Sequence, residues 1–201
     1  MNLTISTYCT IYNKKVFLNG EQLHEDLAGE EDFLKALYKK LEIDYSKFYK
    51  MDGISRLGLL GVELLKTANH GLLNCEDDEV AMVFQSENGC LESDVNHQLE
   101  VNKKSPSPAV FVYTLSNIVI GEISIRNKWY GESIFFIDNF DSNKNLLSYS
   151  KSLLLSGKAK KIIAAKIEHF DENVFLSCAL IDEEGSMPLT DENLKKVLNT
   201  K

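Results

Sequence analysis

Residues able to act as nucleophiles or metal ligands are sparse in this chain. It has four cysteines and four histidines among 201 residues, and no pair of cysteines has the C-x-x-C spacing of a zinc or redox motif. Cys90 is the candidate nucleophile, because it follows Gly89 at a predicted helix start, where the helix dipole lowers the pKa of a thiol. No histidine is close to it in sequence. We therefore interpret the cysteines as reduced, mostly buried thiols.

The remaining polar motifs favour structural roles. His97 has no second metal ligand at a suitable spacing, so we expect no metal site. The stretch from Ser86 to Gly89 contains too little glycine to cradle a phosphate, and no cofactor is expected. The acidic pairs at 77–78, 183–184 and 191–192 are interpreted as loop and helix-cap residues.

The composition excludes several classes of protein. With 22 Lys+Arg against 30 Asp+Glu the formal net charge is −8, which argues against nucleic acid as the main partner, because phosphate binding needs clustered basic residues. No apolar stretch approaches the ~20 residues of a membrane span. The first lysines follow the N-terminal apolar run, the reverse of a secretory signal. We expect a cytoplasmic protein with a single domain over residues 1–201.

Strands and helices alternate along most of the chain. Apolar and β-branched runs predict strands over residues 3–17, 80–84, 133–137, 161–167 and 174–181. Apolar residues at three- and four-residue spacing predict helices at 30–41, from 55, after 89, at 114–127, from 141 to 157 and from 190. Ser55 is the expected cap of the second helix. The pattern predicts an α/β fold with a mainly parallel sheet and an antiparallel strand at the end.

One long segment resembles a known family. Residues 107–140, SPAVFVYTLSNIVIGEISIRNKWYGESIFFIDNF, are similar to the stretch before the nucleophile in β-ketoacyl-acyl-carrier-protein synthases, which are thiolase-fold condensing enzymes. The matching positions are Ser107, Pro108, Phe111, Thr114, Asn117, Gly121, Ile125, Gly131 and Ser133. The match continues without a gap to Glu168, which in the family braces the nucleophile's helix, and it is weaker upstream, around Met51 and Asp52.

The departures from the family pattern remove its chemistry. The position of the nucleophilic cysteine falls on Phe140, and a phenyl ring cannot form a thioester. The family's glycine pair is replaced by Ala165 and Lys166. Its two histidines lie in a second half that this sequence lacks, and none of the four histidines here stands in a matching context. The resemblance therefore implies a thiolase-like N-terminal half with no catalytic residue of its own and no second half.

The resemblance also implies an architecture and a dimer. We expect a five-stranded, mostly parallel sheet in the order 3-2-1-4-5 with helices on both faces. Residues 3–12 form strand 1 and residues 133–138 form strand 3 at the edge. An apolar edge strand without lysine or proline invites pairing with another chain, and the four leucines at 146, 147, 153 and 154 in the next helix also need covering. The expected interface comprises Ser133, Ile134, Phe135, Phe136, Ile137, Asp138 and Phe140.

The implied function is that of a chain-length-factor-like subunit. Such a subunit partners an active β-ketoacyl synthase in bacterial fatty-acid or polyketide-type synthesis, as in aryl-polyene or flexirubin-type pigment pathways, and shapes the partner's acyl pocket. Because acyl carrier proteins are acidic, we expect the carrier to contact the partner rather than this acidic chain.

The residues expected to shape that pocket are aromatic. In the family, the loop before the helix at Thr114 reaches towards the partner's acyl pocket. Here that loop spans residues 109–113, so Phe111 or Tyr113 is the expected gate, a ring that closes the end of the partner's acyl pocket. The alternative is that both rings belong to the core of this chain.

Two other functions remain open from the sequence. One is an acyl-binding or scaffolding homodimer without a synthase partner. The other is an acyl transferase or hydrolase that uses an unidentified residue.

Overall fold

The computed structural model describes residues 2–27, 29–171 and 173–199. In this part of the chain one sheet has the order β3-β2-β1-β7-β6-β4-β5, and β8 also pairs with β1. The strands are β1 (Thr4–Tyr12), β2 (Lys15–Leu18), β3 (Glu21–Leu23), β4 (Val80–Ser86), β5 (Ser133–Ile137), β6 (Lys161–Phe170), β7 (Asn173–Asp182) and β8 (Met187–Pro188).

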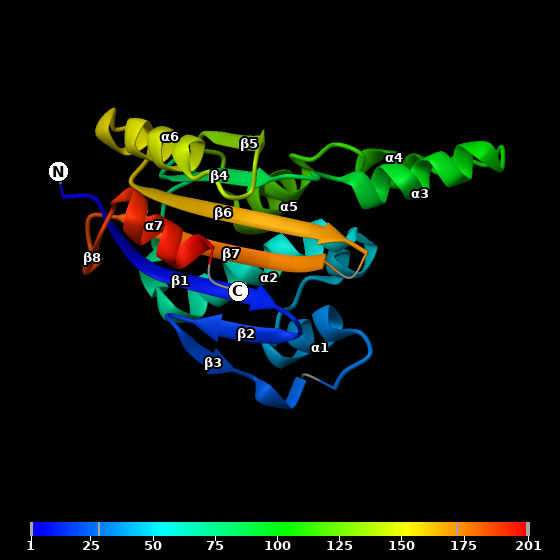
Figure 1. Ribbon diagram of the computed structural model, residues 1–201, viewed down its shortest axis with the longest axis horizontal. Coiled ribbons are helices and arrows are strands. Elements are labelled where there is room, and N and C mark those ends of the chain that lie inside the picture. Colours follow the sequence, from blue (N-terminus) through cyan, green and yellow to red (C-terminus); the bar gives the residue numbers. More distant parts are fainter. Residues whose placement is uncertain (1, 28, 172, 200–201) are drawn as a thin grey trace.

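Helices cover both faces of the sheet, and one helical pair projects beyond it (Figure 1). Helices α1 (Phe33–Lys40), α2 (Gly53–Ala68) and α5 (Ile118–Asn127) share one apolar core with the sheet, and α6 (Lys144–Leu155) and α7 (Asp191–Leu198) share the other. Helices α3 (Leu91–Asn102) and α4 (Pro108–Val112) extend away from the body of the molecule. We call this pair the α3–α4 arm. Short 3₁₀ turns lie at Glu25–Leu27 (η1), Ser46–Lys50 (η2) and His70–Asn74 (η3).

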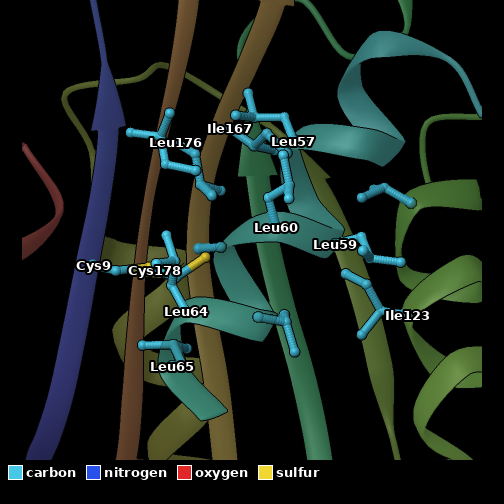
Figure 2. Packing of buried hydrophobic residues seen from close by; sticks show 14 of the residues in the cluster. Cys9, Leu57, Leu59, Leu60, Leu64, Leu65, Ile123, Ile167, Leu176 and Cys178 are labelled. Carbon is cyan, nitrogen blue, oxygen red and sulfur yellow. The ribbon is translucent and has the colours of Figure 1, made fainter. Parts of the chain in front are cut away.

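Helix α2 is the central helix of the first core. Leu57 and Leu60 lie beside Ile167 of β6 and Leu176 of β7, whereas Leu59 lies beside Ile123 of α5 (Figure 2). A Cβ on Gly61 would lie 2.1 Å from Leu176 Cδ2, so a glycine lets the helix approach the sheet closely. The cap differs from the prediction: Asp52 accepts a hydrogen bond from the Ser55 backbone N–H at 3.0 Å, whereas Ser55 itself is buried in the first turn. Aspartate is as good a cap as serine and stands one position before the first helical residue.

The predicted parallel centre of the sheet is confirmed. Strand β4 pairs parallel with both β5 and β6, and every residue of β4 is buried, as expected of a strand with helices on both faces. Strand β6 turns back into β7, which is antiparallel to it. Of the five strands β5, β4, β6, β7 and β1, only β7 therefore runs against the others.

The predicted strand order was wrong for the first strand. Residues 4–12 do not lie between the second and fourth strands, because both edges of β4 are taken, by β5 and β6. Strand β1 instead pairs antiparallel with the outer edge of β7, which gives the five strands the order 3-2-4-5-1. Strands β2, β3 and β8 were not expected as parts of the sheet and extend it beyond five strands. The α/β class, the edge position of β5 and the adjacency of β6 and β7 are confirmed.

Helix α6 does not need a further layer to cover its leucines. Leu146, Leu153 and Leu154 are buried in the core that α6 shares with the sheet and α7, and Leu147 is half-buried against it. The expectation that these side chains call for a partner was therefore wrong, because α7 and the sheet cover them. Gly157 ends the helix with φ +71°, the left-handed conformation that favours glycine. No helix in the described residues is both long enough and apolar enough to cross a bilayer.

Candidate functional site

The turn between β5 and α6 holds the position that the resemblance assigns to a nucleophile. Phe140 lies there, and its ring packs edge-on against Phe175 with centroids 5.1 Å apart. The Lys166 ammonium lies 5.1 Å from the centroid of the Phe140 ring and donates hydrogen bonds to the Phe140 carbonyl and, at 2.7 Å, to Asn199 Oδ1. The turn is therefore filled by an aromatic ring that the chain's own sheet and the end of α7 hold in place.

Lys166 is fully buried and has no carboxylate among its hydrogen-bond partners in the described residues. Burial lowers the pKa of its ammonium to about 8, and the nearby Asp141 opposes this shift. The family resemblance indicated this residue only as the replacement of a glycine. A lysine inside the apolar run of β6 was the available signal, and sequence reasoning did not assign it a role.

Cys90 is not an activated thiol. It is buried next to the first turn of α3, where burial raises the pKa of the thiol, the opposite of the expectation from the helix dipole. Its Sγ donates to the Thr114 carbonyl at 3.1 Å and accepts from Ser116 Oγ at 3.3 Å. Desolvation dominates because the thiol faces the protein rather than water. In residues 2–27, 29–171 and 173–199 no three His, Cys, Asp or Glu side chains gather as a metal site.

Glu168 has a structural role. Its buried carboxylate accepts hydrogen bonds from Ser86 Oγ at 2.9 Å, from Asn88 Nδ2 at 3.0 Å and from the Glu87 backbone N–H. It therefore braces the turn from β4 into α3, and its hydrogen bonds go to that turn rather than to the helix after Phe140. The neighbouring His169 pairs with Glu92 on α3. Both residues hold the base of the α3–α4 arm.

The outer edge of β5 is open in the described part of the chain. The Glu132 carbonyl accepts from Met82 N–H and the Asp138 N–H donates to the Ser86 carbonyl, so backbone groups of even-numbered residues face β4. Those of Ser133, Phe135 and Ile137 consequently face the open edge. The side chains of Ile134 and Phe136 pack against one core and that of Phe135 against the other. Ile137 is 59 % exposed.

The α3–α4 arm carries several exposed apolar side chains. Its second helix lies where a loop was expected from the sequence, at residues 109–113. Residues 108–112 instead form α4, because Ser107 caps it and Pro108 occupies its first position. The exposed apolar residues of the two helices are Leu91, Val95, Leu99, Val101, Phe111 and Val112. An apolar surface of this kind on a projecting element is typical of an interaction site.

The two aromatic residues expected as a gate differ in their surroundings. Phe111 is 58 % exposed, which rules out the alternative that both rings are core. Tyr113 packs partly against the core, and its hydroxyl donates to Glu122 Oε1 at 3.1 Å. Glu122 is buried and its other oxygen lies 2.7 Å from Lys47 Nζ. Burial and the adjacent Glu122 raise the pKa of Tyr113, so its hydroxyl stays protonated and keeps donating to Glu122.

Comparison with solved structures shows the fold. A structure of the ketosynthase ApeO with its chain length factor ApeC from Xenorhabdus doucetiae matches at TM-score 0.62 and 19 % identity, over 92 % of this chain and 81 % of that chain. The ishigamide ketosynthase/chain length factor matches at TM-score 0.68 and 13 % identity, over 94 % and 64 %. A β-ketoacyl synthase from Burkholderia phymatum matches at TM-score 0.59 and 8 % identity, over 90 % and 59 %.

The chain thus has the thiolase-like fold of ketosynthases and chain length factors, as the resemblance implied. It spans less than two thirds of the second and third of these structures. No protein-family model and no curated protein matches the sequence.

Proposed function

We propose that this chain is a non-catalytic, ketosynthase-like subunit that pairs with an active β-ketoacyl synthase, in the manner of a chain length factor. The observation that carries the proposal is Phe140, whose ring occupies the turn where the resemblance requires a thiol and is held there by Phe175 and Lys166. Without a nucleophile at this position no acyl-enzyme can form there. Solved structures of the same fold that contain a ketosynthase together with a chain length factor support the pairing.

The subunit consists of one thiolase-like half and acts in the cytoplasm. The outer surfaces of α6 and α7 support the first point, because Lys144, Ser148, Ser152, Asp191 and Lys195 on these helices are exposed. A second half packed over these helices would have to take these charged groups out of water, which costs several kcal/mol for each charge that is not paired. We therefore expect the polar outer surface of α6 and α7 to face solvent rather than to be buried in the middle of a larger molecule.

The partner binds along the open edge of β5. Backbone groups of Ser133, Phe135 and Ile137 face this edge, and a strand from the partner would satisfy them. A hollow of about 370 Å³ beside the edge, lined in part by Ser116, Ile120 and Phe135, would receive side chains of the partner. Of the interface residues expected from the sequence, Ile134 and Phe136 support the strand from within, whereas Ser133 and Ile137 make the outer contacts.

The same subunit limits product length through Phe111. This ring is exposed on the projecting α3–α4 arm, where it is able to enter a partner's acyl pocket, whereas the hydroxyl of Tyr113 is tied to Glu122. Tyr113 then forms a wall behind the gate. The formal charge of −8 keeps an acidic carrier protein on the partner.

A lysine at the edge of β5 tests the interface. Ile137→Lys leaves the core intact, because the side chain is already 59 % exposed, but places a charge in the proposed interface. Leu155→Lys is the matched control, since Leu155 is 62 % exposed at the end of α6. Co-expressed with its ketosynthase, the control should co-purify with the partner and Ile137→Lys should not. Equal recovery of the partner with both variants would rule out this edge.

A further inference from the structure

The gate ring is packed against a histidine of the neighbouring helix. The ring of His97 on α3 faces that of Phe111 on α4, with centroids 5.4 Å apart and planes tilted by 52°. This contact joins two helices that project together from the body of the molecule. The backbone between them is also tied, because Glu100 Oε2 accepts from the Ser107 N–H at 3.0 Å. The base of α4 is therefore fixed relative to α3, and His97 contacts the side chain that α4 presents.

No hydrogen bond to Nδ1 orients the His97 ring. Its Nδ1 is buried and has no hydrogen-bond partner in the described residues, although buried ring nitrogens are ordinarily paired. The ring is thus held by packing, and Phe111 is part of that packing. His97 is half-buried as a residue, and an apolar ring in its place would fill the same space without leaving Nδ1 unpaired.

We propose that His97 is a positioning residue for the Phe111 gate and thereby helps to set product length; this inference rests on the proposed function. Phe111 lies on a helix of five residues, none of them buried, so its side chain has few other contacts to restrict its rotamers. The imidazole occupies the space between the phenyl ring and α3. The phenyl ring therefore points away from α3 and reaches the acyl pocket of the partner. Without the imidazole, the ring falls back into the vacated space and the pocket deepens.

The test measures product lengths from the chain reconstituted with its ketosynthase. His97→Ala should lengthen the products by at least one extension unit, which is also the result expected of Phe111→Ala. His97→Phe keeps a ring at this position and should restore the wild-type length. Gln98→Ala, an exposed neighbour on α3, should leave the length unchanged. The double variant His97→Ala/Phe111→Ala should match Phe111→Ala alone, because His97 acts only through the ring.

The outcomes separate this inference from the proposed function. Unchanged products from a folded His97→Ala, where Phe111→Ala does lengthen them, would overturn the positioning role and leave the gate in place. A double variant that lengthens products beyond Phe111→Ala would also overturn it, since His97 would then act independently. Unchanged products from Phe111→Ala would remove the gate, and the positioning role with it.

Discussion

Phe140 and Lys166 stand where the resemblance to condensing enzymes expects a nucleophilic cysteine and a glycine. The aromatic ring takes the place of a thiol, and the lysine beneath it takes the place of a small residue, which leaves the turn filled. Of these two positions, the resemblance assigns a catalytic role only to that of Phe140. Their contacts with each other and with Phe175 are those of a packed structural unit.

The first prediction at this scale is that the chain has no condensing or decarboxylating activity, and that Phe140→Cys does not create it. None of the four histidines of this sequence stands in the context where the resemblance places the pair that accepts and returns a proton. Product formation by the purified chain, with an active ketosynthase as positive control, is the measurement. Turnover that survives purification and disappears on mutation of one residue of this chain would contradict the prediction.

The second prediction concerns pH. The pKa of Lys166 is about 8 in the folded chain against a usual value of 10.5, so the unfolded state binds more protons between these values. Stability contributed by this group therefore rises as the pH increases from 8 towards 10.5, by roughly 1–3 kcal/mol. The two hydrogen bonds of the ammonium favour its charged form and keep the gain below the full shift.

Lys166→Met supplies the comparison for this effect. The variant removes the titrating group, so the difference in unfolding free energy between wild type and variant should change across this window. Other groups, such as the Cys75 and Cys90 thiols, titrate in both proteins and cancel. Denaturant unfolding at pH 7, 8, 9 and 10 measures the difference. A constant difference between the two proteins would show that Lys166 stays protonated throughout.

At the scale of elements, the α2 helix shows how closely the sequence constrains the packing. Gly61 is placed so that a Cβ would meet Leu176 Cδ2 at 2.1 Å, whereas nothing lies within 4 Å of a Cβ built on Gly121 of α5. Gly61→Ala should destabilise the fold by about 1–3 kcal/mol through overpacking. Gly121→Ala should be neutral or stabilising by up to ~1 kcal/mol through helix propensity. Thermal and denaturant unfolding of the pair measures both; equal effects would refute the close approach of α2 to β7.

Most helices and strands could be predicted from the sequence. The predictions failed where the position or role of a segment depends on contacts with residues far away in the chain. The apolar runs at 80–84 and 161–167 identified two central strands, and leucine spacing identified α2 and α6. The position of β1 depends on which strand has an unpaired edge, here β7 rather than β4. A local sequence pattern does not contain this information. Lys166 and Glu122 were missed because their roles come from residues far away in the sequence, Asn199 and Lys47 among them. The state of Cys90 was misjudged because burial outweighed the helix dipole.

At the scale of the whole molecule, the two sides of the sheet and its edges have different character. Helices α6 and α7 present polar residues to solvent, while the β5 edge and the α3–α4 arm leave backbone groups and apolar side chains uncovered. A molecule with a polar, solvated face and an unpaired strand at one edge of its sheet is suited to a side-by-side dimer that pairs along that edge. This asymmetry is consistent with the proposed function, in which the partner would supply the chemistry and this chain a surface for it.

The most direct test of this account is native mass spectrometry of the chain purified from its host, before and after exposure to an acyl donor. We predict a one-to-one complex with a ketosynthase in which the added acyl mass is found on the partner and none on this chain. A chain that occurs only as a monomer or a homodimer, or that itself carries the acyl group, would contradict the account.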